Sequence, residues 1–398
     1  MRVTHVITRL ILGGAQENTL ASVLGPRQSG EFDADLITGP ALGPEGSLLP
    51  PGPLPPFITV LPQLVRPIHP WFDVLAFARL VRLLRARQPH IVHTHSGKAG
   101  VLGRLAARRA RVPVIVHTLH GPSFGPFQGA LANQLFLTAE RIAARVTTHF
   151  VVVADALRAQ YLAAGIGQPE QYTKILSGFD LAPFLAARND PQQRARWGLA
   201  PEDFVVGKIA RLFKLKGHED LFNVAPELVR RCPRMKFLLV GDGPWRGRFE
   251  RRASDLGLRS HFVFAGLQPP TEIPALVGIM DAVVHLSRRE GLPRALAQAL
   301  AAGRPVVAYD CDGAREVCRD GETGFLLAPG DRAGLQTRLL ELAGDAALRA
   351  RLGERGRALV REQFPVERMV QSLQTLYRKL AADAGISSGN PARGPHPA

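Results

Sequence analysis

The stretch from Ala282 to Ala308 constrains the fold more than any other part of this 398-residue chain. An apolar strand, Ala282–Leu286, leads into a turn whose only acid, Glu290, is followed by a glycine. An Ala- and Leu-rich helix comes next, and then a second apolar strand, Pro305–Ala308. Two strands joined by one helix pair in parallel, so the segment predicts a βαβ unit. The unpaired N–H groups at the start of such a helix suit a phosphorylated ligand.

Short apolar strands alternate with amphipathic helices through both halves of the chain, which predicts the α/β class. The first half predicts strands at Val3–Thr8, Ala34–Thr38, Ile91–Thr94, Val114–Thr118 and Thr148–Val153. Helices are predicted from about Ala15 and near Trp71–Arg87, Lys98–Arg109 and Leu131–Arg145. The second half predicts strands at Phe204–Ala210, Lys236–Val240, His261–Ala265, Ala282–Leu286, Pro305–Ala308 and Gly324–Leu327. The length suits two cores, so we predict two Rossmann-like domains.

The boundary between these domains is predicted at Ser177–Asp180, which is followed by the polar stretch Arg188–Arg196. The first domain would then cover residues 1–185 and the second 190–364, and a last helix at 365–381 could cross back to the first.

Two further segments are predicted to be irregular. The Pro- and Gly-rich segment Gly39–Pro56 is expected to form a surface loop. The polar end of the chain, 384–398, is expected to be a disordered tail.

The chain is strongly basic, with a net charge of +16 and a pI near 10.8, and it contains only seven lysines. Because an arginine- and alanine-rich composition can reflect genome bias, this charge is weak evidence about partners. Aromatic residues are sparse and no nucleic-acid-binding motif is present, so we expect no specific nucleic acid. An anionic substrate or an anionic membrane surface fits the charge better.

The expected compartment is the cytoplasm. No apolar run approaches the length of a membrane span, and the first residues resemble a strand, not a secretory signal. Three cysteines, an odd number without zinc spacing, suit a reducing environment: Cys232, Cys311 and Cys318. Peripheral contact with the inner face of a membrane is an open option.

A basic turn follows the first strand of the second half. It contains Arg211 and Lys216, and a forked guanidinium beside a compact ammonium at a strand's end suits a diphosphate. A solvated basic turn is an equally good interpretation of these residues alone. The two other lysines of the turn region, Lys208 and Lys214, are predicted to lie on the surface.

Glycine turns follow two other predicted strands. Gly13 and Gly14 precede the first helix, where glycine would let a phosphate or sugar approach the backbone, although an ordinary tight turn is as good an interpretation. Gly241 opens a Gly-Asp-Gly-Pro turn whose residue types favour a structural role.

Four histidines are expected at the ends of neighbouring strands: His93, His95, His117 and His120. His120 is the candidate catalytic residue among them, although a lone histidine at a strand end is more often a structural hydrogen-bonding group. The local stretches offer no carboxylate or cysteine partner, so we expect no metal.

The Glu290 turn resembles the nucleotide-sugar signature of the family 4 glycosyltransferases, in which a second glutamate lies eight residues after the first. In this chain the second position is Gln298. The opening His5–Gln16 is also similar to the start of many family 4 enzymes. The resemblance covers Met1 to Leu380 and implies the GT-B architecture, in which two Rossmann-like domains face each other across a cleft.

The family pattern implies a role for each residue that matches it. Arg211, Lys216 and the amides near Gly291 and Leu292 would hold the diphosphate of the donor. Glu290 would orient the transferred sugar.

Three further residues complete the implied site. Gln298 would bind the ribose, with a loss of about 1 kcal/mol relative to the charge-assisted bond of a glutamate. The Gly241 turn would lie near the nucleotide, and Gly13 and Gly14 near the donor. His120 would stabilise the reacting sugar from the first domain, opposite Glu290.

The resemblance therefore implies a retaining glycosyltransferase that needs no metal or other cofactor. It would move a sugar from a UDP- or GDP-linked donor to a hydroxyl of a polysaccharide or lipid-linked glycan. No carboxylate nucleophile is evident opposite the sugar, so we expect no glycosyl-enzyme intermediate. The resemblance implies front-face departure, in which the diphosphate acts as the base.

Three alternatives stay open from the sequence. A sugar-nucleotide 2-epimerase shares this architecture. A non-catalytic partner subunit with a degenerate donor site would explain Gln298, but Arg211, Lys216 and Glu290 argue against it. Charge-driven polyanion binding would be steeply salt-dependent.

Overall fold

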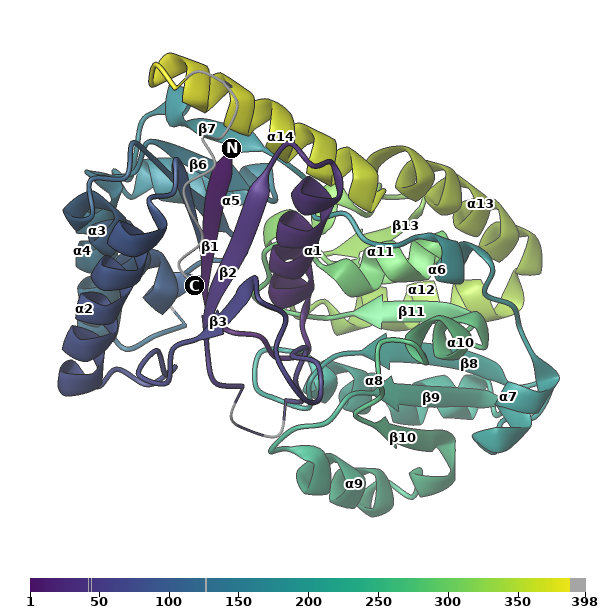
Figure 1. Cartoon of the computed structure of the whole chain (residues 1–398). Coiled ribbons are helices and arrows are strands. Elements are labelled where there is room, and N and C mark those ends of the chain that lie inside the picture. The colour runs from purple at the N-terminus through teal and green to yellow at the C-terminus, as the bar shows by residue number, and fades with distance from the viewer. Residues whose placement is uncertain (42, 44, 126, 387–398) are drawn as a thin grey trace. The chain divides into compact units, whose positions relative to one another are not determined.

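The computed structural model describes residues 1–41, 43, 45–125 and 127–386. The chain divides into two units, shown in Figure 1. Unit 1 comprises Met1–Ile175 and the residues from Glu367 onward, and unit 2 comprises Leu176–Val366. No helix in the described ranges is long and apolar enough to cross a membrane.

Unit 1 is built on one parallel sheet of seven strands in the order β3-β2-β1-β4-β5-β6-β7. The strands are β1 (Arg2–Arg9), β2 (Asp33–Gly39), β3 (Ile58–Val60), β4 (Ile91–His95), β5 (Val114–Leu119), β6 (His149–Val152) and β7 (Tyr172–Lys174). The strands β4, β5 and β6 are buried along their whole length, as expected for a parallel sheet covered on both faces. The sheet order reverses between β1 and β4.

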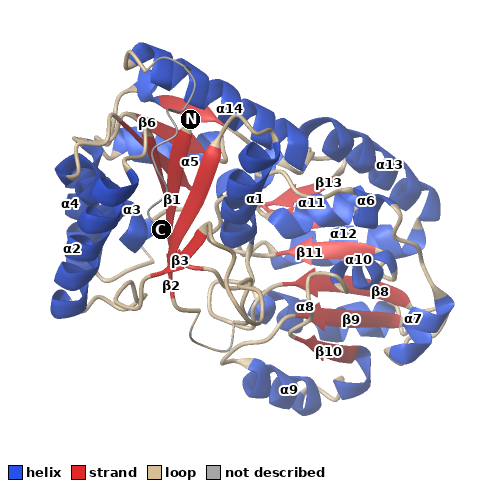
Figure 2. Ribbon diagram, in the orientation of Figure 1, coloured by secondary structure: helices blue, strands red, loops and turns tan. Residues whose placement is uncertain are grey.

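The helices of unit 1 cover both faces of this sheet. They are α1 (Gly14–Gln28), α2 (Pro70–Arg87), α3 (Gly97–Arg109), α4 (Ala130–Ala144), α5 (Asp155–Ala163) and α14 (Val366–Asp383). Figure 2 shows α2, α3 and α4 on one side of the sheet and α1 on the other.

The last helix, α14, packs in unit 1 although it follows all of unit 2 in sequence. Arg378 forms an ion pair with Glu31 at 2.6 Å, and the hydroxyl of Tyr377 lies 2.5 Å from Nδ1 of His93. After α14 the backbone closes in a turn in which the N–H of Ile386 donates to the carbonyl of Ala381 at 2.8 Å. The rest of the predicted tail, 387–398, lies outside the described residues.

Unit 2 is built on a parallel sheet of six strands in the order β10-β9-β8-β11-β12-β13. The strands are β8 (Phe204–Ile209), β9 (Met235–Val240), β10 (Phe262–Gly266), β11 (Ala282–His285), β12 (Val306–Tyr309) and β13 (Gly324–Leu327). The helices are α6 (Ala182–Leu185), α7 (Pro191–Arg196), α8 (His218–Arg231), α9 (Arg246–Asp255), α10 (Ile273–Gly278), α11 (Arg294–Ala301), α12 (Arg332–Gly344) and α13 (Ala346–Gln363).

Two apolar cores lie on opposite faces of this sheet. Val206 and Val284 face one core, which includes Phe222 of α8, and Val205 and Val283 face the other. Neighbouring strand residues point to opposite faces, so each strand contributes to both cores. This explains why the strands read as continuous apolar runs in the sequence.

The polar stretch that follows the predicted boundary is part of unit 2. Arg194, in α7, is only 3% exposed, and its guanidinium forms an ion pair with Asp281 at 2.8 Å. Phe179 and Phe184 also pack in the core of unit 2. The unit therefore begins at Leu176, beside the predicted boundary at Ser177–Asp180 and earlier than the predicted first residue, 190. A buried arginine and two aromatic residues anchor this segment in the unit.

Candidate active site

The loops that follow β8, β9 and β11 meet at the carboxyl ends of these strands in unit 2. The N–H of Arg288, after β11, donates to the carbonyl of Leu215, after β8, at 2.9 Å. The N–H of Leu212 donates to the carbonyl of Asp242, after β9, at 3.0 Å. The strand order reverses between β8 and β11, and open α/β sheets bind their ligands at such a switch point.

Lys216 and Glu290 form the centre of this edge. Nζ of Lys216 pairs with Oε1 of Glu290, and the hydroxyl of Ser287 donates to the same oxygen at 2.9 Å. Nε2 of His285 lies 3.4 Å from that oxygen. The side chains of Lys216 and Glu290 are 24% and 20% exposed, so a ligand can reach a pair that is largely shielded from water.

The charges around Glu290 keep it ionised. Burial opposes its ionisation, but the ammonium of Lys216 and the contacts from His285 outweigh burial and hold the pKa of Glu290 well below its usual value. Burial lowers the pKa of His285, so this ring is neutral near pH 7. The pair therefore offers an anionic acceptor for hydroxyl groups beside a cation for a phosphate.

The loop after β12 holds the turn that begins α11. The N–H of Glu290 donates to the carboxylate of Asp312 at 2.6 Å. The N–H of Gly313 donates to the carbonyl of Gly291 at 2.9 Å. Gly291 is buried and Leu292 is half-buried, directly before the first turn of α11. The turn is thus fixed from a neighbouring strand, and the helix N-terminus that follows it is suited to an anion.

Lys208 is buried, and the prediction that it lies on the surface was wrong. The residue is 1% exposed in β8 and shares a sheet face with Val206, two residues earlier. Burial lowers the pKa of Lys208 to about 7, and the charge of Lys216 adds to this effect. Lys214 is exposed, as predicted.

The other predicted donor residues of unit 2 lie around the same edge. Arg211 is exposed, and its guanidinium carbon lies 5.5 Å from the ring centroid of Phe213. Gln298 is half-buried, one turn into α11. Gly241 has φ of 129°, and a Cβ there would lie 2.3 Å from the carbonyl oxygen of Ala210, so this turn requires glycine.

The remaining predicted residues lie in unit 1. Gly13 precedes α1 with an extended backbone, and Gly14 is the first residue of that helix. A Cβ at Gly13 would meet only the flexible side chain of Gln16, at 2.8 Å, so the local backbone does not require glycine here. His120 directly follows β5 and is half-buried, with Nε2 3.0 Å from Nδ1 of His95.

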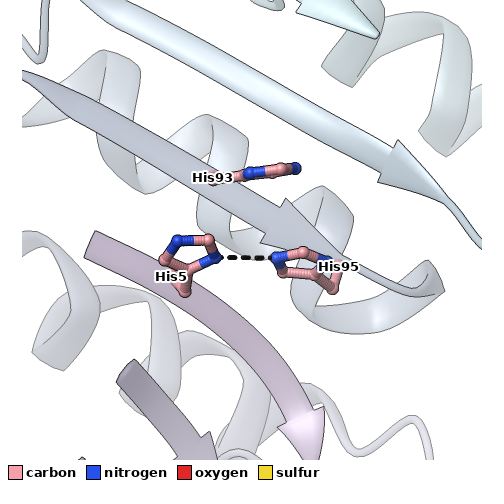
Figure 3. A group of neighbouring side chains, drawn as sticks. All are labelled: His5, His93 and His95. Atoms are coloured by element: carbon pink, nitrogen blue, oxygen red, sulfur yellow. Dashed lines mark hydrogen bonds between the residues drawn. The ribbon is translucent and has the colours of Figure 1, made fainter. Parts of the chain in front are cut away.

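Three histidines lie buried beneath His120, on adjacent strands. His5 of β1 pairs in register with His93 of β4, and His95 lies two residues further along β4. Figure 3 shows these three rings together. Burial lowers the pKa of His5 to about 3 and holds the pKa values of His93 and His95 well below the usual value.

Sequence reasoning missed four residues at the edge of unit 2: His218, His285, Ser287 and Asp312. Ser287 and His285 lie close to Glu290 in sequence, and Asp312 follows a strand that ends at the same edge, so the strand-end rule could have found them. His218 is fully buried, and neither ring nitrogen has a hydrogen-bond partner in the described part of the chain. Burial lowers its pKa to about 2, and no sequence signal indicates this.

Each half of the chain matches the model of a glycosyltransferase domain family. Residues 14–175 match the model of the glycosyl transferase 4-like domain, and residues 189–359 match that of the glycosyl transferases group 1. The UDP-Gal:alpha-D-GlcNAc-diphosphoundecaprenol alpha-1,3-galactosyltransferase of Escherichia coli is 27% identical over 388 residues, 95% of this chain and 96% of that protein.

Two further relatives agree. The GDP-mannose-dependent alpha-(1-6)-phosphatidylinositol monomannoside mannosyltransferase of Mycolicibacterium smegmatis is 32% identical over 268 residues, 65% of this chain and 68% of that protein. The crystal structure of HepE from Anabaena in complex with UDP-glucose has a TM-score of 0.76 and 23% identity, over 95% of this chain and all of that one. The fold is therefore GT-B, and the chain belongs to the family 4 glycosyltransferases.

Proposed function

We propose that this enzyme is a retaining glycosyltransferase that uses a UDP- or GDP-linked sugar and acts on a polysaccharide or lipid-linked glycan. The observation that supports it most is the Lys216–Glu290 pair beside the start of α11. Cleavage of a glycosyl–phosphate bond leaves negative charge on the diphosphate, which a cation and helix-terminus amides stabilise. The sugar hydroxyls in turn need an ionised acceptor, and Glu290 provides one.

The proposed reaction assigns each group a part. The bond between the sugar's anomeric carbon and the diphosphate oxygen breaks, and its electron pair stays on the diphosphate. Arg211, Lys216 and the amides of Gly291 and Leu292 stabilise that charge, while Glu290 orients the sugar and Gln298 binds the ribose. The acceptor hydroxyl attacks from the same face and gives its proton to the departing diphosphate. His120 stabilises the reacting sugar, and no step requires a metal.

The class of donor and acceptor is proposed from the relatives. The Escherichia coli enzyme is named for UDP-Gal and a diphosphoundecaprenol acceptor, and the Mycolicibacterium smegmatis enzyme for GDP-mannose and a phosphatidylinositol mannoside. Both acceptors are lipid-linked. We therefore propose that the enzyme works at a membrane surface, in the cytoplasm that the sequence predicts.

Peripheral membrane contact is supported by exposed apolar side chains at the start of α2. Ile68, Trp71 and Val74 are 58%, 67% and 61% exposed. The same helix carries exposed basic residues further along: Arg79, Arg82 and Arg85. An apolar end with a tryptophan and a basic face suits the interface of an anionic membrane.

The donor site is tested by calorimetry with UDP, GDP, ADP and their common sugar conjugates. We expect one nucleotide family to bind wild type and to lose most of its affinity in Lys216→Ala. Lys214→Ala is the matched control, because Lys214 lies in the same loop but is exposed. If no nucleotide bound at millimolar concentration, the donor site would be degenerate and the proposal wrong.

Product analysis separates transfer from epimerisation. With the bound donor alone, a transferase leaves the sugar's configuration at its second carbon unchanged, whereas an epimerase inverts it without any acceptor. We expect no change until a lipid-linked acceptor is added, and then one new glycosidic bond with the donor's anomeric configuration. A product of the opposite configuration would contradict the retaining assignment.

A further inference from the structure

Three histidines of unit 1 form a hydrogen-bonded chain that ends at His120. Nδ1 of His5 lies 3.0 Å from Nε2 of His95, and Nδ1 of His95 lies 3.0 Å from Nε2 of His120. In each pair the ring centroids are 5.3 Å apart, and the ring planes differ by 15° and 26°. Rings that meet nitrogen to nitrogen at this spacing are joined edge to edge, as Figure 3 shows for His5 and His95.

The chemistry of imidazole requires every N–H of this chain to point the same way along it. A neutral ring has one N–H, so His95, which lies in the middle, must donate from one nitrogen and accept at the other. Burial lowers the pKa of His5 to about 3 and that of His120 to about 4, so neither ring carries a second proton near pH 7. The three N–H groups therefore all point inward or all point outward.

The buried end of the chain decides between these directions. Nε2 of His5 is buried and has no hydrogen-bond partner in the part of the chain that the structure describes. An inward chain would leave an unpaired N–H at this atom, whereas an outward chain leaves an unused lone pair. Buried orphan donors are rarer in proteins than under-used acceptors. The N–H groups thus point from His5 toward His120.

We propose that His95 is a positioning residue that holds His120 as the Nδ1–H tautomer by donating a hydrogen bond to its Nε2. Among the described residues, no hydrogen bond uses Nδ1 of His120. This N–H is then the group that His120 offers to a ligand oxygen. His120 acts as a neutral hydrogen-bond donor toward the sugar and not as a base. Only this last role rests on the proposed function, because the tautomer is a property of the protein alone.

The same rings were the place to look for a metal, since one nitrogen from each of His5, His93 and His95 lies within 4.8 Å of the others. Their geometry favours hydrogen bonding instead. The rings of His93 and His95 stack with centroids 4.4 Å apart and planes 25° apart, and stacked rings cannot both point a nitrogen at one ion. Both nitrogens of His93 also have hydroxyl partners, Tyr377 at 2.5 Å and Thr118 at 2.6 Å.

The tautomer is measured directly by long-range proton–nitrogen NMR on the full chain labelled with ¹⁵N-histidine. We expect His120, assigned with His120→Gln, to be protonated at Nδ1 in wild type. In His95→Phe, which keeps a flat ring but donates nothing, we expect His120 to revert to the Nε2–H form that imidazoles prefer in water. Wild-type His120 protonated at Nε2 would overturn the proposal. So would one equivalent of zinc in the purified protein whose removal shifts the signals of His5 and His95.

The functional consequence is measured on transfer to the acceptor. We expect His95→Phe to lower kcat roughly 10- to 100-fold, by analogy with the loss when a group that orients a metal-bound imidazole is removed. The KM for the donor should stay the same. His95→Asn, whose side-chain amide can take the place of Nδ1–H, should recover most of the loss. His117→Asn is the control, because His117 is a buried histidine of the neighbouring strand β5 that bonds Thr94 instead.

The two measurements separate this inference from the proposed function. If His120 is the Nδ1–H tautomer but the protein transfers no sugar, the inference about the histidine chain holds and the transferase role is refuted. If His120 changes tautomer in His95→Phe but transfer proceeds normally, the histidine chain has no role in catalysis.

Discussion

At the scale of single residues, the Lys216–Glu290 pair determines how the site meets a donor. Lys216 already has a carboxylate partner, so a diphosphate that binds there must share the ammonium of Lys216 with Glu290. We predict that Glu290→Gln binds UDP or GDP as tightly as wild type or more tightly, while transfer falls about 100-fold. Calorimetry and a product assay measure the two effects. Glu322→Gln, which changes an exposed carboxylate, is the control, and weaker nucleotide binding in Glu290→Gln would contradict the prediction.

Gln298 gives a second prediction at this scale. The residue is half-buried in α11, in the position where the family pattern has a glutamate. A carboxylate there would make charge-assisted bonds to the ribose hydroxyls, worth about 1 kcal/mol more than those of the amide. We therefore expect Gln298→Glu to bind the nucleotide about fivefold more tightly in calorimetry. Unchanged or weaker binding would mean that Gln298 does not contact the ribose.

At the scale of elements, the turn into α8 depends on Gly217. Its φ is 68°, and a Cβ would lie 2.0 Å from the carbonyl oxygen of Leu286. We predict that Gly217→Ala lowers the free energy of unfolding by roughly 3 kcal/mol or more, because it adds a backbone clash to the cost of the left-handed conformation. It should also weaken nucleotide binding, since Lys216 precedes it.

The matched control for this turn is Gly198→Ala. Gly198 has a similar φ of 65°, but nothing lies within 4 Å of its Cβ position. The control should therefore lose only the conformational part, about 1 kcal/mol, and keep its nucleotide affinity. Equal losses in the two variants, measured by urea unfolding, would show that the clash at Leu286 is relieved by movement of the loop.

The elements that the sequence predicted well are those with apolar runs or helical periodicity, such as β9, β11 and α2. The edge strands β3 and β7 were missed because each has only three residues and no pattern of its own. The helix α7 was not predicted as a helix because its composition is polar. Its burial depends on the ion pair of Arg194 with Asp281, a residue far along the chain.

At the scale of the whole molecule, the buried histidines make stability depend on pH. Burial lowers the pKa of His5 to about 3, and those of His120 and His149 to about 4, whereas the unfolded chain titrates near the ordinary value of 6.5. Below that value the unfolded state binds protons that the native state does not. Stability is therefore complete above pH 6.5 and is lost as the pH falls toward 4, by about 1.4 kcal/mol per pH unit for each histidine.

The measurement for this prediction is the thermal midpoint at pH 7.5, 6.5 and 5.5. We expect a small change over the first step and a marked fall over the second. His149→Asn removes one buried imidazole at the margin of the sheet and should make that fall smaller. A midpoint that is the same at all three values would refute the assignment of neutral, buried rings.

The sequence by itself determined the class of the fold, the two Rossmann-like units and the residues of the Glu290 turn. These features follow from local periodicity and from the residue types at strand ends. Both are patterns among residues that are close together in the sequence. Only the tertiary structure decided that Lys208 is buried and that Asp312 holds the Glu290 turn. It also decided that His5 and His95, 90 residues apart, form one chain ending at His120. Such contacts depend on which strands become neighbours in the sheet, and no local pattern carries that information.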